Sequence, residues 1–82
     1  MTAKEMFEEL EYKLSDEDDL QIRYTKKHFI SDTSYILFNK KDKIINNFIV
    51  SDSPFTPPTD LPLNMKELQA INKQVKELQW DE

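Results

Sequence analysis

The sequence predicts an α+β domain with the order helix, three-stranded antiparallel meander, long proline-rich loop and C-terminal helix (α-β-β-β-α). Three observations lead to this fold class. Apolar residues recur at helical spacing near both ends of the 82-residue chain, its middle alternates with the two-residue period of strands, and all four prolines lie within residues 51–63. A chain of this length forms one domain, which we place over residues 1–82.

A first helix is predicted over about residues 3–12. Thr2 followed three residues later by Glu5 is the pattern of a capping box, in which the two residues hydrogen-bond each other across the first turn. An apolar stripe runs along this helix and consists of Ala3, Met6, Phe7 and Leu10. The glutamates between these residues are expected to face water.

The second helix, over about residues 65–79, has the clearest periodicity in the chain. Asn64 and Glu67 repeat the capping-box pattern at its start. Its apolar stripe consists of Leu68, Ile71, Val75 and Leu78. The stripe spans barely two heptads, which is too short for an independent coiled coil, so we interpret it as core. Trp80 follows as either a core edge or an exposed contact.

Three strands are predicted, over about residues 20–26, 33–39 and 43–50. The first alternates apolar and polar residues, which is typical of a half-buried strand. The other two carry apolar residues on both faces, which indicates central strands or a second covered face. The pair Asn46-Asn47 in the third strand indicates a bulge. Short links between the strands predict a meander that both helices cover on one face.

The proline-rich residues 51–63 are predicted to form an extended loop, because proline lacks the N–H that a sheet requires. The predicted core consists of Met6, Phe7, Leu10, Leu20, Ile22, Tyr24, Tyr35, Leu37, Ile45, Leu68, Ile71, Val75 and Leu78. Four apolar residues remain for the second face of the sheet: Ile36, Phe38, Ile44 and Phe48. Either the loop covers that face through Phe55 and Leu61, or a partner or a second copy does.

The composition excludes several classes of site. The chain has no glycine, which removes phosphate-cradling loops, dinucleotide fingerprints and nucleophile elbows and leaves left-handed turn positions to Asn and Asp. It has no cysteine, which excludes disulfides and cysteine metal sites. No apolar run approaches the roughly 18 residues of a membrane span. We therefore expect no cofactor, no membrane segment and a cytoplasmic location.

The net charge of −5 is unevenly distributed along the chain. Residues 1–19 hold eight acids and two lysines, for a charge of −6, whereas residues 20–50 hold six bases and two acids, for +4. The candidate partner-binding residues are the acids Glu8, Glu9, Glu11, Asp16, Glu17, Asp18 and Asp19. They form either a solvated loop or a negative surface that docks on a basic protein. A calcium loop lacks its glycine and its final glutamate here, so no metal is expected.

Helix, three strands and helix is also the element order of double-stranded-RNA-binding domains. The lysine pairs at residues 26–27 and 40–41 fall on successive turns of a meander, and therefore at opposite ends of the sheet. They cannot easily form one phosphate-binding patch, which argues against direct nucleic-acid binding. His28 is the only histidine and has no cysteine or motif-placed serine to activate, so the sequence predicts a protein that is not an enzyme.

Two stretches, residues 2–12 and 65–80, resemble the two ends of small proteins encoded by phages and prophages of Gram-positive bacteria. The family pattern often has glycine where Glu11 and Gln79 stand. The resemblance implies an accessory phage protein in the bacterial cytoplasm, with no catalytic residues to transfer. In size, charge and element order the chain is also similar to some small acidic anti-CRISPR inhibitors, which implies binding to a host nucleic-acid-handling protein. The alternative is a phage structural or assembly accessory protein that oligomerises through the apolar sheet face.

Overall fold

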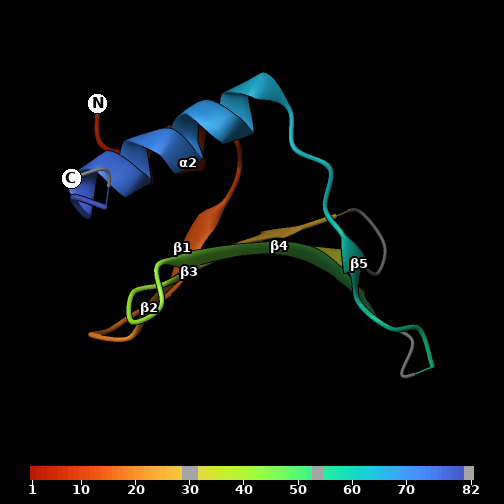
Figure 1. Ribbon diagram of the computed structural model, residues 1–82. Helices are drawn as coiled ribbons and strands as arrows, with labels where there is room; N and C mark the ends of the chain where they lie inside the picture. Colours follow the sequence, from red (N-terminus) through yellow and green to blue (C-terminus); the bar gives the residue numbers. More distant parts are fainter. Residues whose placement is uncertain (29–31, 53–54, 81–82) are drawn as a thin grey trace.

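The computed structural model describes residues 1–28, 32–52 and 55–80. They form an α+β fold in which both helices lie on one side of an antiparallel sheet (Figure 1). The sheet has five strands in the order β1-β2-β3-β4-β5, which is their order in the chain. The α+β class and the two helices are confirmed, whereas the predicted number of three strands was wrong.

The elements are α1 (Ala3–Glu9), β1 (Lys13–Glu17), β2 (Gln21–Lys27), β3 (Asp32–Asn39), β4 (Ile44–Ser51), β5 (Thr59–Asp60) and α2 (Met65–Glu77). The strands β2, β3 and β4 are the three that the sequence predicts. The two that it missed, β1 and β5, are the edges of the sheet. Both helices begin where predicted and end a few residues earlier.

Strand β1 overlaps residues 15–19, which the sequence predicts to be an acidic loop after the first helix. Lys13 pairs with Thr25 and Glu17 with Ile22, and the register shifts at a bulge between Leu14 and Asp16. Leu14 is the only apolar residue among the five, so no alternation reveals the strand. Its charged side chains are typical of an edge strand, where they discourage pairing with other chains.

Strand β5 interrupts the predicted loop over residues 51–63 and pairs with Phe48 and Ile49 of β4. Leu61 follows it into the core and is held there because the Asn47 side-chain amide donates to its carbonyl at 2.7 Å. The predicted bulge at Asn46-Asn47 was wrong, since β3 and β4 pair there without a shift in register. Asn47 has a different role, because its side-chain amide hydrogen-bonds the residue that follows the edge strand β5.

Both capping boxes form as predicted, at Thr2 with Glu5 and at Asn64 with Glu67. The second residue after each helix has left-handed backbone, Glu11 after α1 with φ 71° and Gln79 after α2 with φ 61°. The next residue closes each end in a Schellman motif, as the Tyr12 N–H donates to the Phe7 carbonyl at 2.9 Å and the Trp80 N–H to the Val75 carbonyl at 3.1 Å.

The prediction that Asn and Asp would occupy left-handed positions was therefore wrong. Among the described residues, the three with positive φ are Glu11, Lys43 and Gln79. At the two helix ends, the left-handed conformation of Glu11 and Gln79 is explained by the aromatic residue that follows each of them. Tyr12 is buried in the core and Trp80 packs against it. The chain reaches those positions only by turning sharply at Glu11 and Gln79.

The core lies between the sheet and the two helices and centres on three aromatic rings. Phe7 stacks on Tyr24 with ring centroids 4.0 Å apart, and Phe38 meets both rings edge-on at 6.2 Å. Trp80 extends this cluster with its ring 6.2 Å from Phe38, so it is a core edge. The fully or largely buried apolar residues are Ala3, Phe7, Tyr12, Ile22, Tyr24, Ile36, Phe38, Leu61, Ala70 and Ile71.

The assignment of β3 side chains to the two faces was reversed in the sequence analysis. Ile36 and Phe38 are fully buried, whereas Tyr35 and Leu37 lie on the far side of the sheet. The four consecutive apolar residues from Tyr35 to Phe38 show no alternation, so the sequence does not indicate which of them face the helices. The strand register determines the buried face, because Ile36 pairs with Tyr24 of β2 and therefore lies on the same face of the sheet as Tyr24.

Two further residues of the predicted core are exposed. Leu20 lies in the turn before β2 and is 63% exposed, and Leu68 on α2 is 39% exposed. Helix α2 is rotated from the predicted stripe, and its buried residues are Glu67, Ala70, Ile71 and Gln74. The remaining predicted core residues of the helices, Met6, Leu10, Val75 and Leu78, pack against the core in partly buried positions.

Candidate interaction surface

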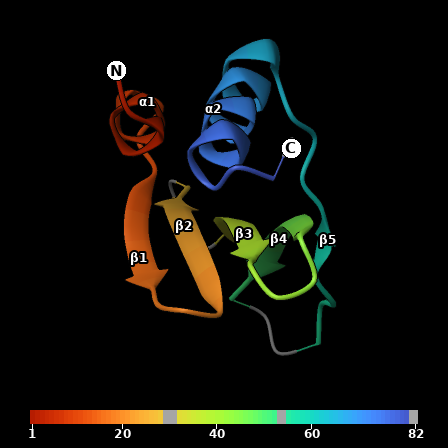
Figure 2. The same cartoon turned by 60° about the vertical axis from the view of Figure 1, so that its left-hand side comes forward.

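The sheet has one covered and one open face. Figure 2 shows α1 and α2 together on one side of the five strands. No helix or strand within residues 1–28, 32–52 and 55–80 lies across the other side (Figures 1 and 2). Phe55, a candidate cover, is 93% exposed, and Leu61 is buried on the helix side. We call the uncovered side the open face.

Apolar side chains from the two central strands form the middle of the open face. They are Tyr35 and Leu37 on β3 and Ile44, Phe48 and Val50 on β4. All five are partly exposed or exposed. The rings of Tyr35 and Phe48, which are direct partners across the two strands, stack with centroids 5.1 Å apart. Of the four residues predicted for an oligomer face, Ile44 and Phe48 lie here, and Ile36 and Phe38 do not.

One row of residues crosses the open face from edge to edge. The pairing register joins Lys13, Thr25, Tyr35, Phe48 and Asp60 in that order, one from each strand. Residues paired across neighbouring strands point to the same face, so the five share the open face. The row has an ammonium group at the β1 edge, a carboxylate at the β5 edge and two stacked rings between them. We call it the central row.

A hollow of about 360 Å³ opens beside the β1 end of the central row. It is lined by Glu11, Lys13, Thr25 and Lys27. Thr25 is the short side chain of the central row, and its neighbours on β1 and β2 are long and charged. The open face is therefore raised at the aromatic pair on β3 and β4 and hollowed over β2.

Two of the seven acids proposed from the sequence hold the turn between β1 and β2. The Asp18 carboxylate accepts the N–H groups of Leu20 at 2.7 Å and Gln21 at 2.9 Å, and these bonds lower the pKa of Asp18. Asp16 accepts a bond from the Gln21 amide at 2.6 Å. The segment that appeared to be a solvated acidic loop is thus partly strand and partly a fixed turn.

The negative charges of three other carboxylates, from different elements, act on one buried phenol. Burial raises the pKa of Tyr24 to about 12, and the negative charges of Glu17, Glu77 and Glu8 add to the rise. Glu8 belongs to α1, Glu17 to β1 and Glu77 to α2, so all three elements converge here. We call these three residues the acidic corner. Sequence reasoning missed Glu77 because it lies nearly 70 residues from Glu8 along the chain.

The lysine pairs lie at opposite ends of β3, as predicted, and two of the lysines have internal contacts. The Lys26 ammonium lies over the ring of Tyr12, 5.6 Å from its centroid. The Lys40 ammonium donates to the Asp18 carbonyl at 2.7 Å. Because these contacts hold the two cations apart, they do not form a single phosphate-binding patch.

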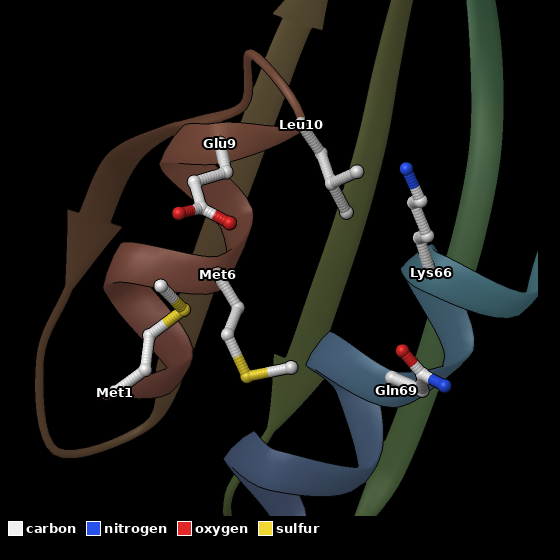
Figure 3. A pocket seen from close by; sticks show the side chains of 6 residues that line it. All are labelled: Met1, Met6, Glu9, Leu10, Lys66 and Gln69. Atoms are coloured by element: carbon white, nitrogen blue, oxygen red, sulfur yellow. The ribbon is translucent and has the colours of Figure 1, made fainter.

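A second cavity, of about 260 Å³, lies between the two helices (Figure 3). It is lined by Met1, Met6, Glu9, Leu10, Lys66 and Gln69. Figure 3 shows Glu9 on the α1 side and Lys66 on the α2 side, with Leu10 between them in this view and the thioethers of Met1 and Met6 nearer α1. This lining offers apolar contact and one charge of each sign, but it contains no nucleophile with an adjacent base.

The sequence found no serine for His28, and the structure supplies one, because its Nε2 hydrogen-bonds the Ser34 hydroxyl. Ser34 is fully buried, so a substrate cannot reach its oxygen in this conformation. The hydrogen bond therefore has a structural role, because it connects His28, just after β2, to Ser34 on β3. Two other buried polar pairs, Tyr12 with Glu67 at 2.6 Å and Tyr24 with Gln74 at 2.7 Å, join the sheet side of the core to α2.

Within the part of the chain that the structure describes, no three His, Cys, Asp or Glu side chains come close enough together to hold a metal ion. Neither helix described here has the length and apolar character needed to cross a membrane. Comparison of the chain with protein-family models, with curated proteins and with solved structures finds no match. The open face and the acidic corner therefore have to be judged on their own chemistry.

Proposed function

We propose that the protein is a non-enzymatic interaction protein that works by covering its open face with another protein surface. The observation that supports this proposal is the stacked pair of Tyr35 and Phe48, which stands partly exposed at the centre of an uncovered sheet. Exposed apolar patches on small domains mark binding surfaces, since their burial removes apolar area from water at about 25 cal/mol per Å². The resemblance to phage proteins makes a bacterial host the natural setting for a partner.

Capture of partners from a lysate of such a host tests this proposal. Phe48→Ser removes the larger apolar part of the stacked pair and should abolish capture. Phe55→Ser is the matched control, because Phe55 is 93% exposed and belongs to no strand of the sheet. Circular dichroism should show that both variants keep the fold. If Phe48→Ser retains every partner of the wild-type protein, the open face is not the binding surface.

A second candidate function is inhibition of a host nucleic-acid-handling protein by acidic docking, as in an anti-CRISPR protein. The specific observation that favours it is the acidic corner: Glu8, Glu17 and Glu77 all help to raise the pKa of Tyr24, on a chain of net charge −5. Carboxylates arranged in this way could occupy a basic groove that otherwise binds phosphates. This function and the first are compatible, since the acidic corner and the open face lie on different parts of the molecule.

Charge reversal separates the two candidates. Glu8→Lys combined with Glu17→Lys should weaken binding to a basic partner at least about tenfold at low salt, and less at high salt because exposed charges are screened. Glu77 should be kept, because its carboxylate accepts the Ala3 N–H at 2.7 Å. Glu9→Lys combined with Asp19→Lys makes the same charge change outside the acidic corner and serves as the control. Equal binding by both double variants would refute the acidic-docking proposal.

A further inference from the structure

We infer that the surface that covers the open face is a second copy of this chain, in a dimer whose two-fold axis runs along β3. This inference rests on the proposed use of the open face and specifies its partner. Three properties of the open face favour a second copy: the charges of the central row, the shape of the face and its size. The first two make the open face complementary to itself.

The order of residues in the central row places opposite charges at its two ends. Lys13 and Asp60 lie on β1 and β5, each two strands away from β3 on opposite sides. A two-fold rotation about β3 reverses the row, so that Lys13 of each copy faces Asp60 of the other. Two opposite-charge pairs then close the two edges of the interface. The two copies have the same net charge and therefore repel each other. The Lys13–Asp60 pairs at the two edges offset part of this repulsion, and they do so in this one orientation only.

The same rotation also matches the shapes of the two open faces. It sets Phe48 of one copy opposite Thr25 of the other, twice. Thr25 is the short residue beside the hollow of about 360 Å³, and Phe48 is one of the two raised rings. Each copy therefore inserts a ring into the hollow of its partner, while the two Tyr35 rings meet at the axis. Lys13 lines that hollow, which brings its ammonium next to the arriving Asp60.

The size of the open face predicts a weak dimer. Five strands about 4.8 Å apart, with usable lengths near six residues at about 3.3 Å each, present on the order of 500 Å² per copy. Two copies bury roughly 1,000 Å² together, slightly below the range of about 1,200–2,000 Å² for stable complexes. We therefore expect a reversible, concentration-dependent dimer. Its two sheets pack with their strands within about 30° of each other, as in sandwiches.

Sedimentation equilibrium of two charge-reversal variants, alone and mixed, tests the arrangement. In Lys13→Glu and in Asp60→Lys each self-dimer contains two repelling pairs, so each variant alone should dimerise at least about tenfold more weakly than the wild-type protein. In an equimolar mixture both contacts become attractive again, and heterodimers should form about as well as wild-type dimers. The controls are Lys41→Glu and Asp19→Lys, which reverse exposed charges outside the open face and should leave dimerisation unchanged.

The mixture also separates specific pairing from net charge. Asp60→Lys reduces the net charge from −5 to −3, so general repulsion alone would make this variant dimerise better. A wild-type protein that stays monomeric up to millimolar concentration overturns the inference, and so does a mixture that dimerises no better than its components. If the wild-type protein is monomeric but Phe48→Ser still loses captured partners, the proposed function stands and only the dimer fails. If Phe48→Ser keeps both its captured partners and its dimer, the proposed function and the dimer are both refuted.

Discussion

Glycine at the two helix ends should stabilise this protein. Glu11 and Gln79 hold left-handed backbone with φ of 71° and 61°, a conformation that costs a residue with a Cβ atom roughly 1–2 kcal/mol. Glycine avoids this cost but loses about 0.5–1 kcal/mol more chain entropy on folding. The difference predicts that Glu11→Gly and Gln79→Gly each raise the free energy of unfolding by about 0.5–1 kcal/mol. The double variant should gain about 1–2 kcal/mol, because each substitution relaxes a different helix.

Urea denaturation followed by circular dichroism measures these changes, and thermal melts should show the double variant about 4–16 °C higher in Tm. Glu11→Ala and Gln79→Ala keep the Cβ atom and should give no such gain, which separates backbone conformation from the loss of a side chain. Gln69→Gly, at an exposed position inside α2, should lower stability by about 1 kcal/mol. If glycine at positions 11 and 79 destabilises as it does at position 69, the left-handed ends carry no strain and the reasoning is wrong.

The remaining predictions concern α2 and its buried contacts. Ile71→Ala should cost about 2–5 kcal/mol, since Ile71 is 4% exposed, whereas Leu68→Ala at 39% exposure should cost less than about 1 kcal/mol; equal urea midpoints would show that the helix faces the other way. Stability should fall as pH rises from about 10 to about 12, because unfolded tyrosine loses its proton near 10 and burial raises the folded pKa of Tyr24 to about 12. Urea denaturation across this pH range should show a smaller loss of unfolding free energy in Tyr24→Phe than in the wild-type protein. An equal loss in both proteins would show that other groups cause it.

The sequence predicts this fold well where one local signal acts alone. Both capping boxes, at Thr2 and Asn64, depend on residues three positions apart, and both form. The three central strands also appear where alternation and β-forming residues predict them. The edge strands β1 and β5 have too few apolar residues for a pattern, because an edge strand is held mainly by the backbone of its neighbour. Nothing within Lys13–Glu17 itself marks it as a strand.

The open face could be anticipated from the sequence only in part. A surplus of apolar residues on β3 and β4 predicted an uncovered side, but the run from Tyr35 to Phe38 could not show which residues it would carry. Pairing of Ile36 with Tyr24 decides this, and that is a long-range choice. The local contacts of the acids could not be predicted for a similar reason. Asp16 and Asp18 accept hydrogen bonds in the turn, and Glu77, which acts on Tyr24, comes from the far end of the chain.

The polar contacts beneath α2 explain why the helix is rotated from its apolar stripe. Tyr12 and Tyr24 bring two hydroxyl groups into the core, and each must find a partner there, since a buried unpaired polar group costs about 1–3 kcal/mol. Glu67 and Gln74 supply these partners, and they lie seven residues apart on the same side of the helix. Turning that side inward moves Leu68 outward.

The same polar contacts also explain why the open face stays open. They hold α2 on the helix side of the sheet, next to α1, and the chain described after β4 adds only β5 and α2. Two helices of seven and thirteen residues cannot cover both faces of a five-stranded sheet. The residues that this geometry leaves uncovered include a stacked aromatic pair among the charged and polar residues typical of a solvated sheet face. We propose that this exposed aromatic pair is covered by another protein surface, and the reversal of charge across the central row favours the chain's own copy.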